Sequence, residues 1–159
     1  MTDEQPCRVL LLDDDPIVVQ AIEALLREES PWDVAGFTSA REALTSVSNN
    51  RYDAVISDFL MPDMDGIRFL KQVKEVQPFT SRIMLTGYAD KQNAIRSINE
   101  VGLYHYIEKP WDNDVLILHL RNALERSRLL RDLDDQARVL AERDRDFAEL
   151  RAKLLKAIL

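Results

Sequence analysis

Residues that break helices are scarce in the sequence, and they stop well before its end. The chain of 159 residues has 4 glycines and 6 prolines, and none of them lies beyond Pro110. The segment after Pro110 can therefore continue as one long helix to Leu159. Before Pro110 the same residues separate short elements. The sequence thus predicts a folded domain followed by a helical extension.

Cysteine, long apolar runs and positive charge are also scarce, and each of these observations limits the compartment or the partners of the chain. A single cysteine, Cys7, excludes an internal disulfide and favours a reducing cytoplasm. No apolar run approaches the roughly 18 residues that a membrane span requires, and the first residues lack the order of a signal peptide. Positive charge is also in deficit, with a net charge of −7, which argues against direct binding to nucleic acid.

Short apolar runs alternate with helical patterns in the first part of the chain. The runs are apolar on both faces, as in parallel strands covered by helices on each side. We expect strands at Val9–Leu12, Trp32–Phe37, Ala54–Ile56, Ile83–Leu85 and Tyr104–Ile107, and helices at Ile17–Glu28, Ala40–Asn49, Ile67–Val76 and Lys91–Glu100. This order predicts an α/β domain with a doubly wound, five-stranded parallel sheet over roughly residues 6 to 125.

Polar side chains follow the expected strands at their carboxyl ends. Asp13, Asp14 and Asp15 follow the first strand, and Asp58 follows the third. Thr86 follows the fourth strand and Lys109 the fifth. Functional residues gather at this edge in sheets of this type, so we expect these groups to converge. Asp15 has a second interpretation, because it precedes Pro16 and can cap the next helix.

Such a cluster suits magnesium-assisted phosphoryl chemistry. Neighbouring carboxylates repel one another, and Mg²⁺ relieves that repulsion while keeping sites open for phosphate oxygens. An aspartate beside Mg²⁺ can attack phosphorus and form an aspartyl phosphate. A lysine such as Lys109 can neutralise the phosphoryl oxygens, and a hydroxyl such as that of Thr86 can bond to one of them.

Four motifs together resemble the response-regulator receiver domain of two-component signalling, which has a flavodoxin-like fold. They occupy residues 11–16 (LLDDDP), 57–66 (SDFLMPDMDG), 85–87 (LTG) and 109–110 (KP). The resemblance implies a cytoplasmic domain of a phosphorelay that takes a phosphoryl group from the histidine of a sensor histidine kinase. It is then a phosphoprotein that passes on a signal, not an enzyme that releases a product.

The resemblance also implies a role for each motif residue. Asp58 is the phosphoryl acceptor, and Asp14 and Asp58 bind Mg²⁺ directly. Asp13 acts on Mg²⁺ through water, and the backbone carbonyl of Leu60 completes the protein ligands. Lys109 neutralises the phosphoryl group.

Two residues are expected to report the phosphorylated state. Thr86 is the switch hydroxyl, and Tyr106 stands where the family has an aromatic switch residue. The resemblance further implies a cis bond between Lys109 and Pro110. A plainer interpretation of Tyr106 is a residue half-buried at the end of a strand.

The last part of the chain carries a heptad pattern, and we assign residues 1–126 to the receiver domain and 127–159 to an extension. Leu133, Leu140, Phe147 and Leu154 recur every seven residues, with Leu130 and Ala137 at the companion spacing. This favours a homodimeric coiled coil that links the receiver to an output domain not included in the sequence. The alternative is a single solvated helix stabilised by ion pairs.

Two other functions compete with the phosphorylated switch. A Mg²⁺-dependent aspartyl-phosphate phosphohydrolase would use Asp58 as nucleophile, but its usual general acid two residues later is replaced by Leu60. A dimerisation scaffold independent of phosphorylation would not need the whole cluster. We expect His105 and His119 to lack nearby metal-ligand partners, so neither predicts a zinc site.

Overall fold

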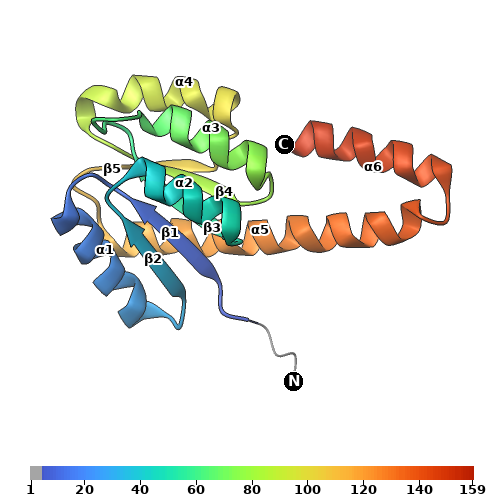
Figure 1. Ribbon diagram of the computed structural model, residues 1–159, viewed down its shortest axis with the longest axis horizontal. Helices are drawn as coiled ribbons and strands as arrows, with labels where there is room; N and C mark the ends of the chain where they lie inside the picture. The colour runs from blue at the N-terminus through green and yellow to red at the C-terminus, as the bar shows by residue number, and fades with distance from the viewer. Residues whose placement is uncertain (1–4) are drawn as a thin grey trace.

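The computed structural model describes residues 5–159, apart from the side chains of Tyr88 and Ser97. Strands and helices alternate along the chain (Figure 1). They are β1 (Arg8–Leu12), α1 (Pro16–Glu29), β2 (Asp33–Phe37), α2 (Ala40–Asn49), β3 (Ala54–Asp58), α3 (Gly66–Val76), β4 (Ser81–Thr86), the short 3₁₀ helix η1 (Tyr88–Asp90), α4 (Lys91–Val101), β5 (His105–Glu108), α5 (Asn113–Ala141) and α6 (Arg145–Ile158).

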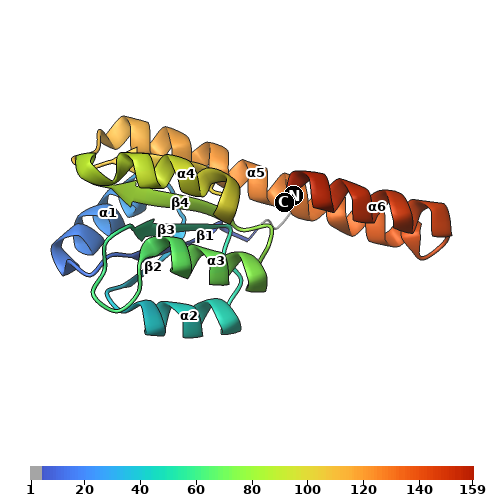
Figure 2. The ribbon, with the colours of Figure 1, turned by 90° about the horizontal axis from the view of Figure 1, so that it is seen from above.

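The five strands form one parallel sheet in the order β2-β1-β3-β4-β5, which confirms the predicted doubly wound topology. Alternate residues of a strand face opposite sides of the sheet. Val9 and Leu11 accordingly pack under α1 and α5, whereas Leu10 and Leu12 pack under α2, α3 and α4. Figure 2 shows these helices on the two sides of the sheet. Both faces are therefore apolar, as the strand sequences predicted.

A buried arginine holds the end of α4 to the sheet. Arg82 of β4 donates from Nε to the carbonyl of Val101 at 3.0 Å and from a terminal nitrogen to that of Gly102 at 3.1 Å. Burial first, and the charge of Arg126 second, lower the pKa of Arg82 to about 10. Gly102 ends the helix with a φ of 61°, a conformation that glycine adopts at low cost. The guanidinium thus satisfies carbonyls that the helix leaves unpaired.

A second polar network ties α5 to the edge of the sheet where the strands begin. Arg131 contacts the carboxylate of Asp53 at 2.5 Å, and both side chains are buried. Ser127 donates to the carbonyl of Asp53 and accepts from the backbone N–H of Ser81 at 2.9 Å. Helix α5 passes residue 126 without interruption, so its anchored part includes the first residues of the predicted extension.

The expectation of one continuous helix to the end of the chain is wrong. Helix α5 ends at Ala141, and α6 folds back against it as an antiparallel hairpin (Figures 1 and 2). Residues 142–146 are all charged, and the Asp144 side chain caps α6 by accepting from the N–H of Asp146 at 2.9 Å. Across the hairpin, Arg151 donates to the buried carboxylate of Asp134 at 2.6 Å. None of the described helices is long and apolar enough to cross a membrane.

The buried pair between Arg131 and Asp53 gives the first testable prediction. Arg131→Met keeps much of the apolar stem but leaves the Asp53 carboxylate buried without this guanidinium. We expect it to lower the free energy of unfolding in urea by about 3 kcal/mol or more. The matched control on the same helix is Arg121→Met, whose partner Glu29 is exposed, and it should cost below about 1 kcal/mol. Equal costs would show that the Asp53 network does not anchor α5.

Candidate functional site

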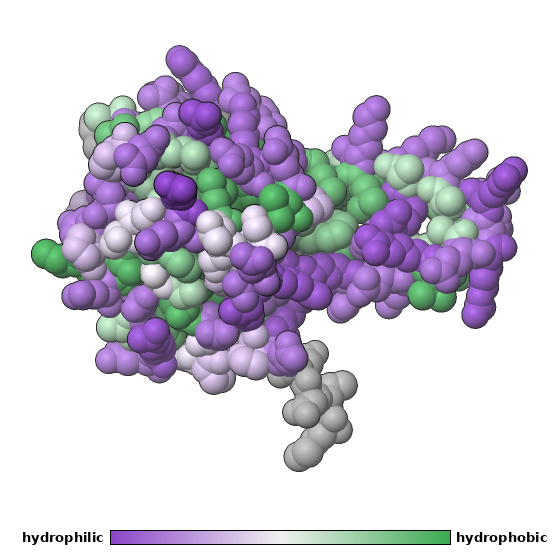
Figure 3. Space-filling model, viewed as in Figure 1, coloured by the Kyte–Doolittle hydropathy of each residue, from purple (hydrophilic) through white to green (hydrophobic). Residues whose placement is uncertain are grey.

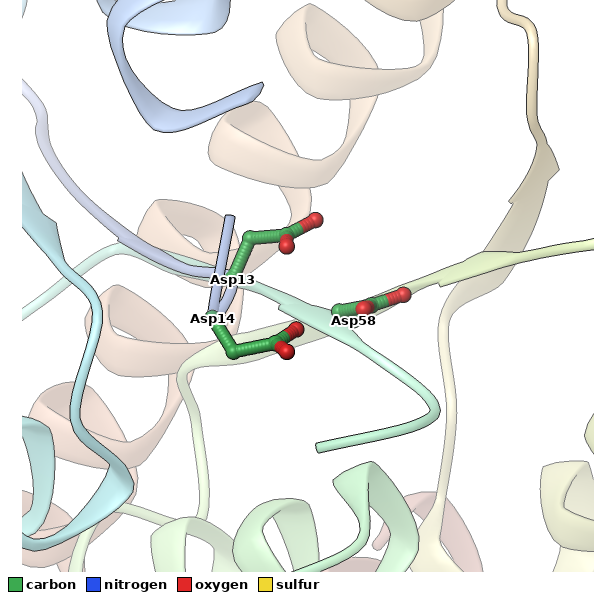
Figure 4. A group of neighbouring side chains, drawn as sticks. All are labelled: Asp13, Asp14 and Asp58. Carbon is green, nitrogen blue, oxygen red and sulfur yellow. The ribbon is translucent and has the colours of Figure 1, made fainter. Parts of the chain in front are cut away.

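The carboxylates predicted to converge do so at the carboxyl ends of β1 and β3. These strands are adjacent, with Leu12 beside Ser57, so the next residues, Asp13 and Asp58, are neighbours. Asp13, Asp14 and Asp58 each offer an oxygen, and the three oxygens lie within 4.8 Å of one another. Figure 4 shows the three carboxylates side by side. Carboxylate oxygens at this spacing suit a hard divalent cation.

Asp15 does not belong to this group. Its side chain caps α1 by accepting from the backbone N–H of Ile17 at 2.9 Å. Its own N–H donates to Asp13 at 2.9 Å and fixes the orientation of that carboxylate. The capping interpretation of Asp15 is thus the one that the structure supports.

Lys109 joins the acidic residues of the two strands. Its ammonium nitrogen lies 2.8 Å from Asp13 Oδ2 and 3.0 Å from Asp58 Oδ1. Burial would lower the pKa of Lys109, but hydrogen bonds and attraction to the two carboxylates outweigh it and raise the pKa. The peptide bond between Lys109 and Pro110 is cis, as the resemblance implied. Lys109 is therefore held as a cation among the carboxylates.

The negative charge of Asp58 is disfavoured in its buried position. It is 8 % exposed, and burial is the main cause that raises its pKa above the ordinary value. Repulsion from Asp13 raises the pKa further, whereas Lys109 and the backbone N–H of Phe59 lower it. The net increase means that the charged carboxylate gains less from its partners than it loses by leaving water. A cation or a phosphoryl group at Asp58 would change this balance.

Thr86 contributes a polar atom that has no hydrogen bond. The residue ends β4 and is fully buried, and its hydroxyl oxygen lacks a partner among the residues described. A buried unpaired hydroxyl costs about 1–3 kcal/mol, so such groups need an explanation. A phosphate oxygen at the carboxyl edge of the sheet would satisfy it.

The loop after β3 comes very close to the acidic residue that it follows. Gly66 donates its backbone N–H to the carbonyl of Phe59 at 2.8 Å. A Cβ on Gly66 would lie 2.2 Å from the carbonyl oxygen of Asp58, which explains the glycine in the motif. Leu60 is 60 % exposed in this loop, and its carbonyl as a metal ligand stays a prediction.

Tyr106 and the histidines lie on the surface next to this site. Tyr106 of β5 is half-buried and packs against the core under α2, α3 and α4. His105 Nε2 lies 3.0 Å from His119 Nε2, which corrects the expectation that these residues lack a partner of metal-binding type. Burial first, and His119 second, lower the pKa of His105. The pairing joins β5 to α5, and no local spacing in the sequence predicts it.

The fold and the acidic site together are those of a response regulator receiver domain. The model of that family matches residues 9–121, and the chain belongs to the family. The match covers β1 through the first turns of α5, including every strand-end residue described above.

Known relatives support the same assignment. The chain is 37 % identical over 133 residues to the hydrogenase transcriptional regulatory protein HoxA of Cupriavidus necator, covering 84 % of this chain and 27 % of HoxA. It is 36 % identical over 122 residues to the C4-dicarboxylate transport transcriptional regulatory protein DctD of Rhizobium meliloti, covering 77 % and 26 %. The chain thus spans about a quarter of the length of these regulators.

Solved structures agree with the fold. The signal receiver domain of an HD domain-containing protein from Pseudomonas fluorescens Pf-5 matches with a TM-score of 0.73 and 35 % identity, covering 78 % of this chain and 98 % of that one. A receiver domain protein from Clostridium thermocellum matches with a TM-score of 0.73 and 32 % identity, with the same coverage. Each match covers 78 % of this chain and therefore leaves 22 % of it uncovered.

The raised pKa of Asp58 gives a prediction about stability and pH. The folded protein holds the Asp58 proton to a higher pH than the unfolded chain, so stability falls as pH rises through that pKa. Without Mg²⁺, Asp58→Asn should therefore melt at the same temperature as the wild type near pH 4 and at a higher one near pH 7. About 1 kcal/mol moves Tm by roughly 2–4 °C in a chain of this size, so the effect is measurable.

The matched control is Asp63→Asn, an exposed aspartate in the neighbouring loop, which should leave Tm unchanged across the same pH range. A lower Tm for Asp58→Asn near pH 7 would contradict the prediction. It would show that the bond to Lys109 exceeds the cost of burying the Asp58 charge.

Proposed function

We propose that this chain receives a phosphoryl group on Asp58 from the phosphohistidine of a sensor histidine kinase. The bond between phosphorus and the histidine nitrogen breaks as a bond to an Asp58 carboxylate oxygen forms. The observation that carries the proposal is the grouping of Asp58, Asp13, Asp14 and Lys109 beside the unpaired hydroxyl of Thr86. Each group matches a need of phosphoryl transfer, which is mainly positioning and charge neutralisation.

Mg²⁺ is the cation that we propose for the acidic cluster. Asp14 and Asp58 would bind it directly, with the Leu60 carbonyl, and would leave positions for water and phosphoryl oxygens. Asp13 already contacts Lys109 at 2.8 Å, which supports a role through water. When bound, Mg²⁺ supplies charge neutralisation on the phosphoryl oxygens. Lys109 supplies a second positive charge, and Thr86 donates to one oxygen.

The competing functions are not favoured. Receiver domains are signalling domains, and the residue two positions after Asp58 is Leu60, which has no proton to give to a leaving group. A scaffold would not retain a buried hydroxyl, an exposed acid and a lysine around one aspartate. We propose a cytoplasmic signalling role, consistent with the single cysteine, and no direct nucleic-acid contact, consistent with the net charge of −7.

Phosphorylation is tested by intact-mass measurement with a small phosphodonor such as acetyl phosphate. We expect a single phosphoryl adduct that requires Mg²⁺ and is absent from Asp58→Asn. Asp14→Asn should need at least about tenfold more Mg²⁺ for the same extent of adduct, a loss of about 1.4 kcal/mol in cation binding. Thr86→Ala should still form the adduct, because its hydroxyl is not the nucleophile.

The control is Asp63→Asn, which should be modified as the wild type is. An adduct that persists in Asp58→Asn would reject Asp58 as the acceptor, and an adduct independent of Mg²⁺ would reject the cation site. Steady phosphate release without accumulation of the adduct would instead favour the phosphohydrolase.

For the output we propose that the hairpin of α5 and α6 forms a homodimer and passes the signal to an effector or output domain. The predicted seam residues Leu133, Leu140, Phe147 and Leu154 are 58, 43, 39 and 50 % exposed, and Leu130 and Ala137 are half-buried. Figure 3 shows apolar side chains among polar ones along the hairpin. Apolar residues exposed in a row support burial against a second copy. The hairpin replaces the long parallel coiled coil as the element that would dimerise.

The dimer gives a prediction for light scattering. The wild type should have the mass of two chains, and the double variant Leu140→Glu/Phe147→Glu should have the mass of one. Its Tm extrapolated to low concentration should be nearly unchanged, since both side chains are already exposed in the single chain. Arg143→Glu in the charged turn is the control and should remain a dimer. A wild type that stays monomeric at high concentration would contradict the proposal.

A further inference from the structure

The chain has only two histidines, and the fold brings both of them together. His105 begins β5, and His119 lies in the second turn of α5. Their Nε2 atoms are 3.0 Å apart, and both rings are partly exposed. They line a shallow pocket together with the carboxylates of Glu108 and Asp112 and the indole of Trp111, none of which belongs to the acidic cluster.

The two rings meet at their Nε2 atoms. Their centroids are 3.9 Å apart and their planes are inclined by 52°. The contact between the nitrogens is a hydrogen bond, in which one neutral ring donates and the other accepts. A cation at about 2.0–2.1 Å from both nitrogens would replace that hydrogen bond, and the rings would turn so that both nitrogens face it.

We infer that His105 and His119 form a binding site for a late first-row divalent cation, preferably Cu²⁺ and then Ni²⁺ or Zn²⁺. Two nitrogens at about 2.0–2.1 Å from a metal lie about 2.9 Å apart at a right angle and about 3.3 Å apart at a tetrahedral angle. The observed 3.0 Å is closer to the right angle of square-planar or tetragonal Cu²⁺ and Ni²⁺. Imidazole nitrogens also prefer these cations to Mg²⁺.

The site is open. The acidic cluster is the sole grouping of three ligand-bearing residues found in residues 5–159, so the histidine pair supplies two ligands and water fills the remaining positions. Burial first, and His119 second, lower the pKa of His105 and favour the neutral ring that metal binding requires. The two sites therefore prefer different cations. Carboxylates at the ends of β1 and β3 suit Mg²⁺, and imidazoles between β5 and α5 suit softer ions.

A cation bound to the two histidines would connect two elements of the fold. His105 lies next to Tyr106, with ring centroids 5.4 Å apart. A cation bound to both histidines would hold β5 to α5 at this point. Trp111, on the wall of the same pocket, offers an optical signal because bound Cu²⁺ or Ni²⁺ quenches nearby indole fluorescence.

The full chain is titrated with Ni²⁺ at pH 7. Excess Mg²⁺ is present to occupy the acidic cluster. Binding is measured by tryptophan fluorescence and by the heat released in a calorimeter. We expect one Ni²⁺ per chain, with affinity at least about tenfold lower in His105→Gln and in His119→Gln, since even loss of a residue behind a ligand costs that much. Asp63→Asn, an exposed aspartate outside both sites, is the control and should bind Ni²⁺ as the wild type does. Unchanged binding in either histidine variant would overturn the inference.

A second measurement avoids dependence on the folding of the variants. The Cu²⁺ complex of the wild type, again in excess Mg²⁺, is examined by electron paramagnetic resonance. Coupling to two imidazole nitrogens is expected, in a tetragonal spectrum. A spectrum with oxygen ligands alone, or no bound Cu²⁺, would overturn the inference even if a histidine variant proved unstable.

Discussion

The contact of Lys109 with Asp13 and Asp58 is the interaction on which the site depends. Parallel strands β1 and β3 are adjacent and in register, so their carboxyl ends necessarily place two aspartates next to each other. Without a cation this arrangement is unfavourable, because like charges repel and burial weakens their hydration. Lys109, delivered from the end of β5 across the sheet, contacts both carboxylates within 3.0 Å. The raised pKa of Asp58 shows that one lysine does not fully offset the cost.

At the opposite edge of the sheet, a buried polar network holds helix α5 in place. There the buried pair of Asp53 and Arg131, with Ser127, connects the start of β3 to the middle of α5. Helix α5 is therefore held near its start by the histidine pair and near its middle by this network. A helical segment held at two points transmits a displacement better than one held at a single point. The hairpin begins only after this anchor.

The strands and the acidic site could be predicted from the sequence because both depend on local order. The apolar runs of β1, β3, β4 and β5 are each followed within two residues by a polar residue of the candidate site, as Ile56 is followed by Ser57 and Asp58, and the topology rule then brings these ends together. The break between α5 and α6 could not be predicted with the same ease. A heptad at Leu133, Leu140, Phe147 and Leu154 continues across it, and only the capping role of Asp144 and the pairing of Asp134 with Arg151 reveal the turn. The two histidines meet through tertiary packing alone, which no spacing in the sequence encodes.

Buried groups that lack favourable partners concentrate at the carboxyl edge of the sheet. Elsewhere in the described chain, buried polar side chains such as Arg82, Asp53 and Ser127 have several partners each. At this edge Thr86 has an unpaired hydroxyl and Asp58 a carboxylate whose charge is disfavoured. Burying an unpaired polar group costs free energy, and most buried groups in this fold avoid that cost by hydrogen bonding. Where the cost remains, a ligand that supplies the missing partner can relieve it. A phosphoryl group on Asp58 would place oxygens where Thr86 and Lys109 can both bind them, and would carry the negative charge from the buried carboxylate onto those oxygens. A bound ligand would relieve these costs, and it would favour the arrangement of the chain in which they are relieved most fully.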